Sequence, residues 1–183
     1  MALLKDNQLQ VGAQAAYQAG NYRQAADGFR QAADLLRQNG DILGAAEMSN
    51  NQSVALLQAG DAAAALKACS GSDELFAEVG DSRRQALALG NQAAALEKIG
   101  KWRDAIEKYE KSAGLLESLG ERELLSITLQ SLSALQLKHN RHADALTSMQ
   151  SSLTAKPSLT AKENILRRLI RLVYQLFQRV PGA

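Results

Sequence analysis

Apolar and polar positions along the chain repeat with the period of an amphipathic helix, and this pattern stops and restarts at a fixed interval. Strand-like alternation is almost absent. The stops fall 20 residues apart and are glycines or an asparagine: Gly20, Gly40, Gly60, Gly80, Gly100, Gly120 and Asn140. Both residue types tolerate the left-handed conformation that ends many helices. The spacing therefore predicts helices of about 14 to 17 residues joined by tight turns.

Two kinds of helix alternate between these stops. One kind, as in "NYRQAADGF" and "KWRDAIEKY", has an alanine five residues after the stop, and these alanines are Ala25, Ala65, Ala105 and Ala145. The other kind reads like "DSRRQALALGNQAAALEK". The unit is therefore a helix A followed by a helix B over 40 residues, present four times and followed by one more A-type helix. We expect one domain over 1–183, with repeats at about 5–40, 41–80, 81–120 and 121–160 and a C-terminal helix at 161–180.

A single helix pair of this kind cannot bury its apolar stripe alone, so neighbouring pairs must stack. The small alanines let the helices approach one another closely. Only two prolines and 4% aromatic residues also fit a nearly all-helical protein. The sequence thus predicts an all-α fold, a curved solenoid whose concave surface carries the function.

The turn around Gly100 supplies a more specific signature. Its glycine, aromatic, alanine, bulky, aromatic and small positions are Gly100, Trp102, Ala105, Ile106, Tyr109 and Ser112. This order resembles the tetratricopeptide repeat (TPR) family over about residues 5–180, and the longer 40-residue unit is similar to the repeats of kinesin light chains and G-protein signalling modulators. The resemblance implies a right-handed superhelix of four helix-turn-helix repeats with a C-terminal helix.

The same resemblance implies a peptide-binding groove lined by the A helices. Asn51 and Asn91 occupy equivalent positions one repeat apart, and an asparagine amide can both donate to and accept from an extended peptide backbone. The alternative, that both are merely solvated, stays open at this point. The other groove residues that the family pattern gives are Gln14, Gln18, Asn50, Gln58, Lys98, Gln130 and Lys138.

The last helix, at 161–180, has a wide apolar arc opposite an arginine-rich face. Three interpretations stay open. It caps the solenoid, it forms a two-fold homodimer interface, or it lies on an anionic membrane surface, the least favoured of the three. The residues predicted for self-association are Leu169, Ile170, Val173, Leu176 and Phe177.

The sequence offers few candidates for a catalytic, metal-binding or phosphate-binding site. Cys69 is the only cysteine and stands where sister repeats have Phe29 and Tyr109, so we interpret it as core filling. His139 and His142 lack a third metal ligand, because Asn140 ends the helix between them. No phosphate-binding loop is present. We therefore expect no catalytic residue, no metal and no cofactor.

Charge is unevenly distributed along the chain. Residues 1–120 carry 12 basic and 15 acidic side chains, whereas residues 121–183 carry 9 and 4. The basic excess lacks interleaved aromatic residues, so we expect no nucleic-acid binding. The N-terminus has no secretory signal and no apolar run is long enough to span a membrane, so we expect a cytoplasmic protein.

These observations predict a non-enzymatic scaffold or adaptor that binds a peptide or helix of another protein. Two alternatives remain. One is a structural module that self-associates through its C-terminal helix, and the other is the sensor or adaptor part of a larger regulator.

Overall fold

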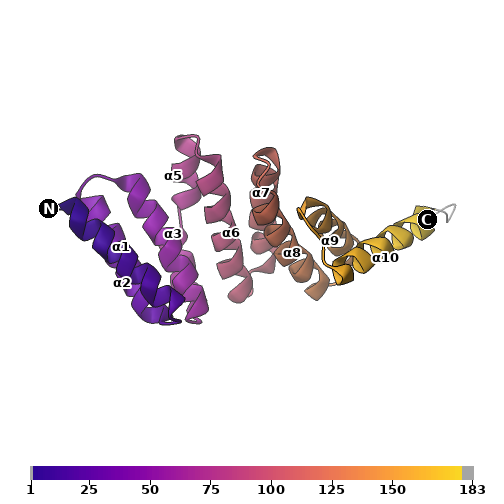
Figure 1. Ribbon diagram of the computed structural model, residues 1–183, viewed down its shortest axis with the longest axis horizontal. Helices are drawn as coiled ribbons and strands as arrows, with labels where there is room; N and C mark the ends of the chain where they lie inside the picture. The colour runs from indigo at the N-terminus through magenta and orange to yellow at the C-terminus, as the bar shows by residue number, and fades with distance from the viewer. Residues whose placement is uncertain (1, 179–183) are drawn as a thin grey trace. The chain divides into compact units, whose positions relative to one another are not determined.

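The computed structural model describes the backbone of residues 2–178 and the side chains of residues 7–172. The described backbone is all-α and contains no strand (Figure 1). Its helices are α1 (Ala2–Gln18), α2 (Tyr22–Gln38), α3 (Ile42–Gln58), α4 (Ala62–Cys69), α5 (Ser72–Glu78), α6 (Ser82–Lys98), α7 (Trp102–Ser118), α8 (Arg122–Lys138), α9 (His142–Ala155) and α10 (Ala161–Gln178). The all-α helical-repeat prediction is confirmed.

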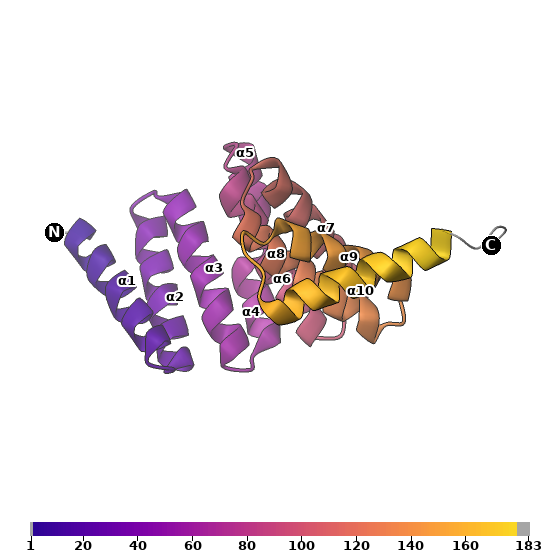
Figure 2. The ribbon, with the colours of Figure 1, turned by 45° about the vertical axis from the view of Figure 1, so that its right-hand side comes forward.

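The chain divides into two compact units, Met1–Leu115 and Leu116–Ala183. In the first unit α2 packs between α1 and α3, as Figure 2 shows, and α6 contacts α3, α4 and α5. In the second unit α9 packs against both α8 and α10. One domain over 1–183 stays a prediction.

The turns between helices share one hydrogen-bonding scheme. Each predicted stop has a positive φ, from 70° to 85° at the six glycines and 59° at Asn140. The next residue then donates its backbone N–H five residues back, as Asp41 N does to Leu36 O at 2.9 Å and Asp81 N does to Phe76 O at 2.9 Å. The predicted helix stops are therefore confirmed.

The residue after the stop also begins the next helix. Asp41, Asp61 and Asp81 each accept a hydrogen bond on the side chain from the backbone N–H three residues on, at 2.8, 3.0 and 2.9 Å. Aspartate is a favoured N-cap because it satisfies an N–H group that has no partner within the helix. One residue thus closes the preceding helix with its N–H and caps the following one with its carboxylate.

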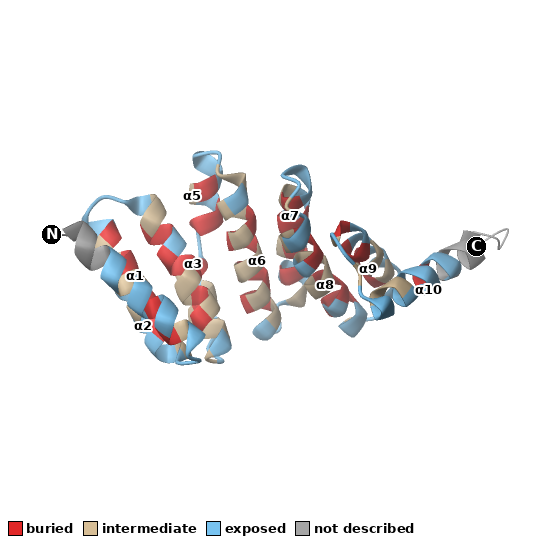
Figure 3. Ribbon diagram, viewed as in Figure 1, coloured by how far each residue is buried: buried red, intermediate tan, exposed pale blue. Residues whose placement is uncertain are grey.

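Small residues form much of the core, and Figure 3 shows buried residues repeated along the successive helices. Ala25, Ala65, Ala105 and Ala145, the four alanines that the repeat pattern selects, are all buried. Another close approach was not anticipated from the pattern. A Cβ atom added to Gly28 of α2 would lie 2.8 Å from the Cβ of Ala13 in α1, so these helices meet where only glycine fits.

Helix B of the second repeat differs from its sequence prediction. The stops at Gly60 and Gly80 predict one helix between them, but α4 ends at Cys69 and α5 begins at Ser72. Gly71 has φ of 78°, and the Ser70 hydroxyl donates to Leu66 O at 2.7 Å. A serine that bonds its own helix, followed by a glycine in the left-handed region, is a strong stop signal. The Ser-Gly pair therefore overrides the repeat pattern at this point.

No helix in the described part of the chain is both long and apolar enough to cross a membrane. Within the same residues, no group of three or more His, Cys, Asp or Glu side chains could hold a metal ion.

Candidate functional site

A pocket of about 480 Å³ lies among α3, α5 and α6 in the first unit, and we call it the α3–α6 pocket. Three of the predicted groove residues, Asn50, Asn51 and Asn91, line it together. The remaining lining residues are Glu47, Val54, Phe76, Asp81, Arg83, Arg84 and Leu87. The structure therefore brings together, from two consecutive A helices, the amides that the 40-residue period predicts to be neighbours.

The three amides differ in burial. Asn51 and Asn91 are half-buried, so their amides remain accessible from solvent. Asn50 is only 6% exposed, and its Oδ1 atom accepts no hydrogen bond from any described residue. A buried acceptor without a donor is uncommon, because it has lost its contact with water and gained nothing in return.

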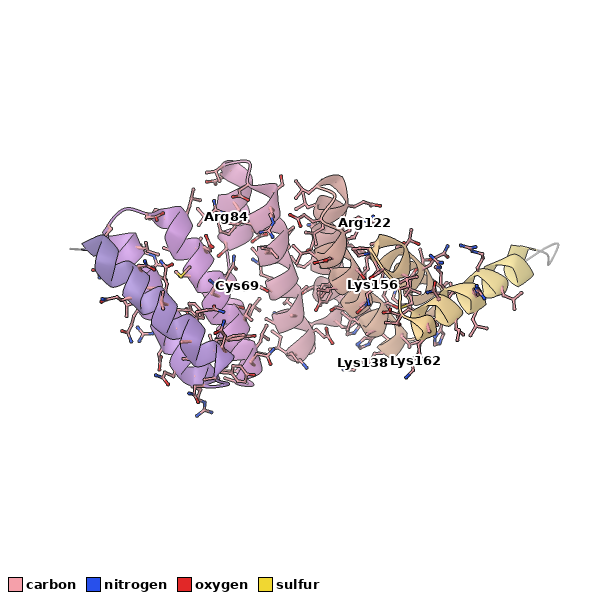
Figure 4. All side chains as sticks on the ribbon, viewed as in Figure 1. Cys69, Arg84, Arg122, Lys138, Lys156 and Lys162 are labelled. Carbon is pink, nitrogen blue, oxygen red and sulfur yellow. The ribbon has the colours of Figure 1, made fainter. Side chains whose placement is uncertain are left out.

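An arginine and two carboxylates form the charged part of the pocket. Arg84 Nε donates to Asp81 Oδ2 at 2.6 Å, and Arg84 Nη1 donates to Glu47 Oε2 at 3.2 Å. The guanidinium also lies over the Phe76 ring, 5.0 Å from its centroid, and Figure 4 labels Arg84 on α6. Such a cation–π contact fixes the plane of the guanidinium at the pocket wall.

These ionic contacts shift two pKa values. The pKa of Asp81 is lowered, because Arg84 donates hydrogen bonds to the charged form of the carboxylate. The bond from the backbone N–H of Arg84 contributes most, and the bond from its side chain comes second. The hydrogen bond to Asp81 raises the pKa of Arg84. The groove prediction missed both residues. The sequence did hold a signal for this pair. Asp81 directly follows a helix stop, as an N-cap residue does, and Arg84 stands three residues further on, where the backbone N–H that bonds an N-cap side chain is expected.

Other predicted groove residues lie elsewhere. Gln14 and Gln18 are exposed on α1, while Gln58 and Lys98 are exposed in the last turns of α3 and α6, outside the α3–α6 pocket. In the second unit, α8 carries Gln130, which is half-buried, and Lys138, which is exposed and labelled in Figure 4. Participation of these residues in binding stays a prediction.

The predicted self-association residues divide into three groups. Leu169 is 54% exposed, whereas Ile170 is 4% exposed and belongs to the buried side of α10. The side chains of Val173, Leu176 and Phe177 lie outside the described residues. The exposed apolar surface of α10 also includes Ile165, Leu166 and Leu172, of which the sequence prediction named none as an interface residue.

Polar contacts hold the first turn of α10. Lys156 Nζ bonds Glu163 Oε1, and the backbone N–H of Thr160 donates to Glu163 Oε2 at 2.9 Å. The hydrogen bond from Lys156 is the largest cause that lowers the pKa of Glu163 to about 2, and the hydrogen bonds from the backbone and side chain of Thr160 add to it. These contacts tie the beginning of α10 to the segment that leaves α9.

The prediction that Cys69 fills the core is confirmed, because its side chain is fully buried. Burial raises the pKa of its thiol, which keeps the group neutral. Beside it, Gln92 Nε2 donates to Cys69 O at 3.0 Å and to Asp73 Oδ1 at 2.6 Å, and Lys108 Nζ donates to Asp73 Oδ2 at 3.0 Å. We call Asp73, Gln92 and Lys108 the polar bridge.

Comparisons with known proteins agree with this description. Residues 84–158 match the tetratricopeptide repeat family. The fold is similar to that of the crystal structure of BtubC (BKLC) from P. vanneervenii, with a TM-score of 0.71 and 16% identity over 94% of this chain and 74% of that one. A comparison with the curated proteins finds no match. The narrower likeness to kinesin light chains and G-protein signalling modulators stays a prediction. The match over residues 84–158, the shared fold and the 40-residue helix pairs together support the resemblance to the tetratricopeptide repeat family.

Proposed function

We propose that this protein is a non-enzymatic interaction module that binds a peptide or helix of another protein, with the α3–α6 pocket at the centre of its binding surface. Repeats of this family generally mediate protein–protein interactions. The observation that carries the proposal is the convergence of Asn50, Asn51 and Asn91 on one pocket from two successive A helices.

The pocket combines the groups that an extended peptide needs. Asn51 and Asn91 can each donate to a peptide carbonyl and accept from a peptide N–H. Val54 and Leu87 provide apolar surface between them. A few orienting polar groups on a partly apolar wall are typical of binding sites.

The test is a selection of random peptides on the full chain, followed by affinity measurement on the double variant Asn51→Ala with Asn91→Ala. Loss of two amide partners should weaken binding by about tenfold to a hundredfold. The matched control is Gln31→Ala with Gln38→Ala, two exposed amide residues of α2 outside the pocket, which should bind like wild type. Equal affinity of wild type and the asparagine double variant would rule out the pocket.

A second candidate function is self-association through α10. Three of its exposed apolar residues, Ile165, Leu166 and Leu172, are equivalent to α8 residues 40 positions earlier that are buried in the second unit, where α8 packs on α9. These α8 residues are Leu125, Ser126 and Leu132, and the equivalent of Leu169, Leu129, is half-buried. Ile165, Leu169 and Leu172 follow the i, i+4, i+7 spacing of a helix–helix seam. The exposed face of α10 is thus the face on which the repeat normally receives a helix. We propose a second α10 as its occupant, because one such seam can pair with its own copy about a two-fold axis.

Light scattering tests this second candidate. The wild type should be a dimer, and the variant Leu169→Glu with Leu172→Glu should be a monomer. In a dimer of this variant the two copies would bury four carboxylates in the helix–helix interface, which is unfavourable. The charge-reversal control Lys162→Glu, in the first turn of α10, should remain dimeric. A monomeric wild type, or a dimer that tolerates the double variant, would contradict self-association through this face.

A further inference from the structure

We infer that the polar bridge of Asp73, Gln92 and Lys108 positions the wall of the α3–α6 pocket, although none of these three residues lines it. The connection runs through α5, which carries Asp73 in its first turn and Phe76 three residues further on. The inference rests on the proposed function and adds positioning residues to it.

The first argument is that α5 cannot hold its place by itself. It is seven residues long, and isolated helices shorter than about 12 residues are only marginally stable in water. The break at Ser70–Gly71 also separates it from α4, so no continuous helix fixes its beginning. Contacts with neighbouring helices must therefore determine where α5 lies.

The polar bridge supplies such contacts at the beginning of α5. Asp73 is 9% exposed, and it accepts hydrogen bonds from Gln92 of α6 at 2.6 Å and from Lys108 of α7 at 3.0 Å. Hydrogen bonds to a charged group are roughly twice as strong as those between neutral groups. Two helices thus hold one carboxylate, and with it the first turn of α5.

The other end of α5 forms part of the pocket wall. Phe76 lines the α3–α6 pocket, is fully buried and shares an apolar cluster with residues of α3 and α6. The guanidinium of Arg84 lies over its ring, and the backbone carbonyl of Phe76 accepts from Asp81 N at 2.9 Å. A displacement of Phe76 would therefore move both Arg84 and Asp81.

Arg84 connects this wall to the two asparagines. From α6 it donates to Glu47 of α3 at 3.2 Å, so the bond joins the two helices that carry Asn91 and Asn51. Glu47 and Asn51 are four residues apart and Arg84 and Asn91 are seven apart, so each pair shares one helix face. The position of α5 thus affects how the two amides are presented to a peptide.

The test compares lysine variants of α7, using a peptide selected on the full wild-type chain. Lys108→Met removes a donor to Asp73 and should weaken peptide binding by about threefold to tenfold. Lys108→Arg keeps a charged donor and should bind within about twofold of wild type. The matched control Lys111→Met loses a lysine that bonds Glu107 instead of Asp73, and it should bind like wild type. An equal loss in Lys108→Met and Lys111→Met would assign the effect to charge and overturn the inference.

A double-mutant cycle tests the route through Phe76. Phe76→Leu removes the ring beneath Arg84 and introduces the residue type of the equivalent Leu116. In this background Lys108→Met should weaken binding by less than about twofold, because the two changes interrupt the same connection. The full loss in this background would exclude Phe76 as the connection and overturn the inference. All affinities are measured well below the melting temperature of the least stable variant, and the lysine variants still decide the matter if Phe76→Leu does not fold.

The outcomes separate this inference from the proposed function. If the Asn51 and Asn91 double variant loses binding but Lys108→Met binds like wild type, the bridge does not position the pocket, and the peptide proposal stands. If no peptide is selected, or the asparagine double variant binds like wild type, the proposed function is wrong and the inference is wrong with it.

Discussion

Helix B of the second repeat and helix B of the third fill slots of equal length but are built differently. Residues 102–118 form the single helix α7, whereas residues 62–78 form α4 and α5 with a break at Ser70–Gly71. The repeat register recovers after the break, because Phe76 and its equivalent Leu116 are both buried. The break therefore changes the path of the backbone locally without adding or removing a residue.

The two helices also differ in what occupies the core beside them. At the position where α7 has the ring of Tyr109, α4 ends at the small side chain of Cys69. Once the helix stops there, the carbonyl of Cys69 accepts from Gln92 of α6. A side chain from the neighbouring helix thus replaces part of the hydrogen bonding that a continuous helix supplies to itself.

The polar bridge is the feature whose removal should have the largest effect. Gln92→Leu introduces the residue type that α8 has at the equivalent Leu132 and leaves Cys69 O and Asp73 Oδ1 without their donor. We expect a loss of about 2–4 kcal/mol in the free energy of unfolding, measured by urea denaturation. A loss below about 1 kcal/mol would mean that the broken helix does not depend on this bridge.

Asp73 should show the next largest effect, and a pH dependence. Burial raises the pKa of Asp73, but hydrogen bonds from Gln92 and Lys108 outweigh burial, so the folded pKa lies below the reference value of 3.8. Its stabilisation is therefore present above about pH 3.8 and is lost as the pH falls through the folded pKa. Asp73→Asn should cost about 1.5–3 kcal/mol at neutral pH, measured by denaturation. The difference from wild type should shrink in acid, and a difference independent of pH would contradict this account.

The backbone of the break itself should matter less. Gly71 has φ of 78°, which costs an L-residue about 1–2 kcal/mol. Gly71→Ala should therefore lower the free energy of unfolding by about that amount in thermal or urea denaturation. An unchanged stability would indicate that the segment can adopt a continuous helix when the glycine is removed.

Gly114 of α7 provides the matched control and the smallest expected change, of opposite sign. A Cβ atom added to Gly114 meets nothing within 4 Å, and its φ is not positive. Gly114→Ala should raise the free energy of unfolding by about 0.5–1 kcal/mol, because alanine is the better helix former. The two Gly→Ala variants, measured side by side, should thus differ in sign, and equal effects would remove the distinction between the two helices.

The sequence was a good guide wherever one position determines one local structure. Gly80 predicted a helix end because few other residues adopt positive φ, and Ala105 predicted a helix contact because it is small. The pairing of Asn51 with Asn91 followed from the repeat period. Each of these predictions depends on spacing along the chain alone.

The rest depends on contacts between residues far apart in sequence. Glu47 and Arg84 are 37 positions apart, and neither their pairing nor the missing donor of Asn50 has a local signature. The broken helix had a local signature in Ser70–Gly71, but the repeat pattern, read over the whole slot, gave the wrong result there. The face of α10 that packs on α9 could not be separated from its exposed face, because isoleucine stands on both, Ile170 buried and Ile165 exposed.

The turn chemistry has a consequence for how such a chain can change in length. Joining Gly40 directly to Asp81 would leave out one whole helix pair, yet it would recreate a junction of the same kind as Gly40–Asp41. The aspartate would again close the helix before it and cap the helix after it, as Asp41 and Asp81 both do. Duplication or deletion of residues 41–80 therefore requires no new loop, and the new junction keeps the hydrogen bonds that Asp41 and Asp81 make.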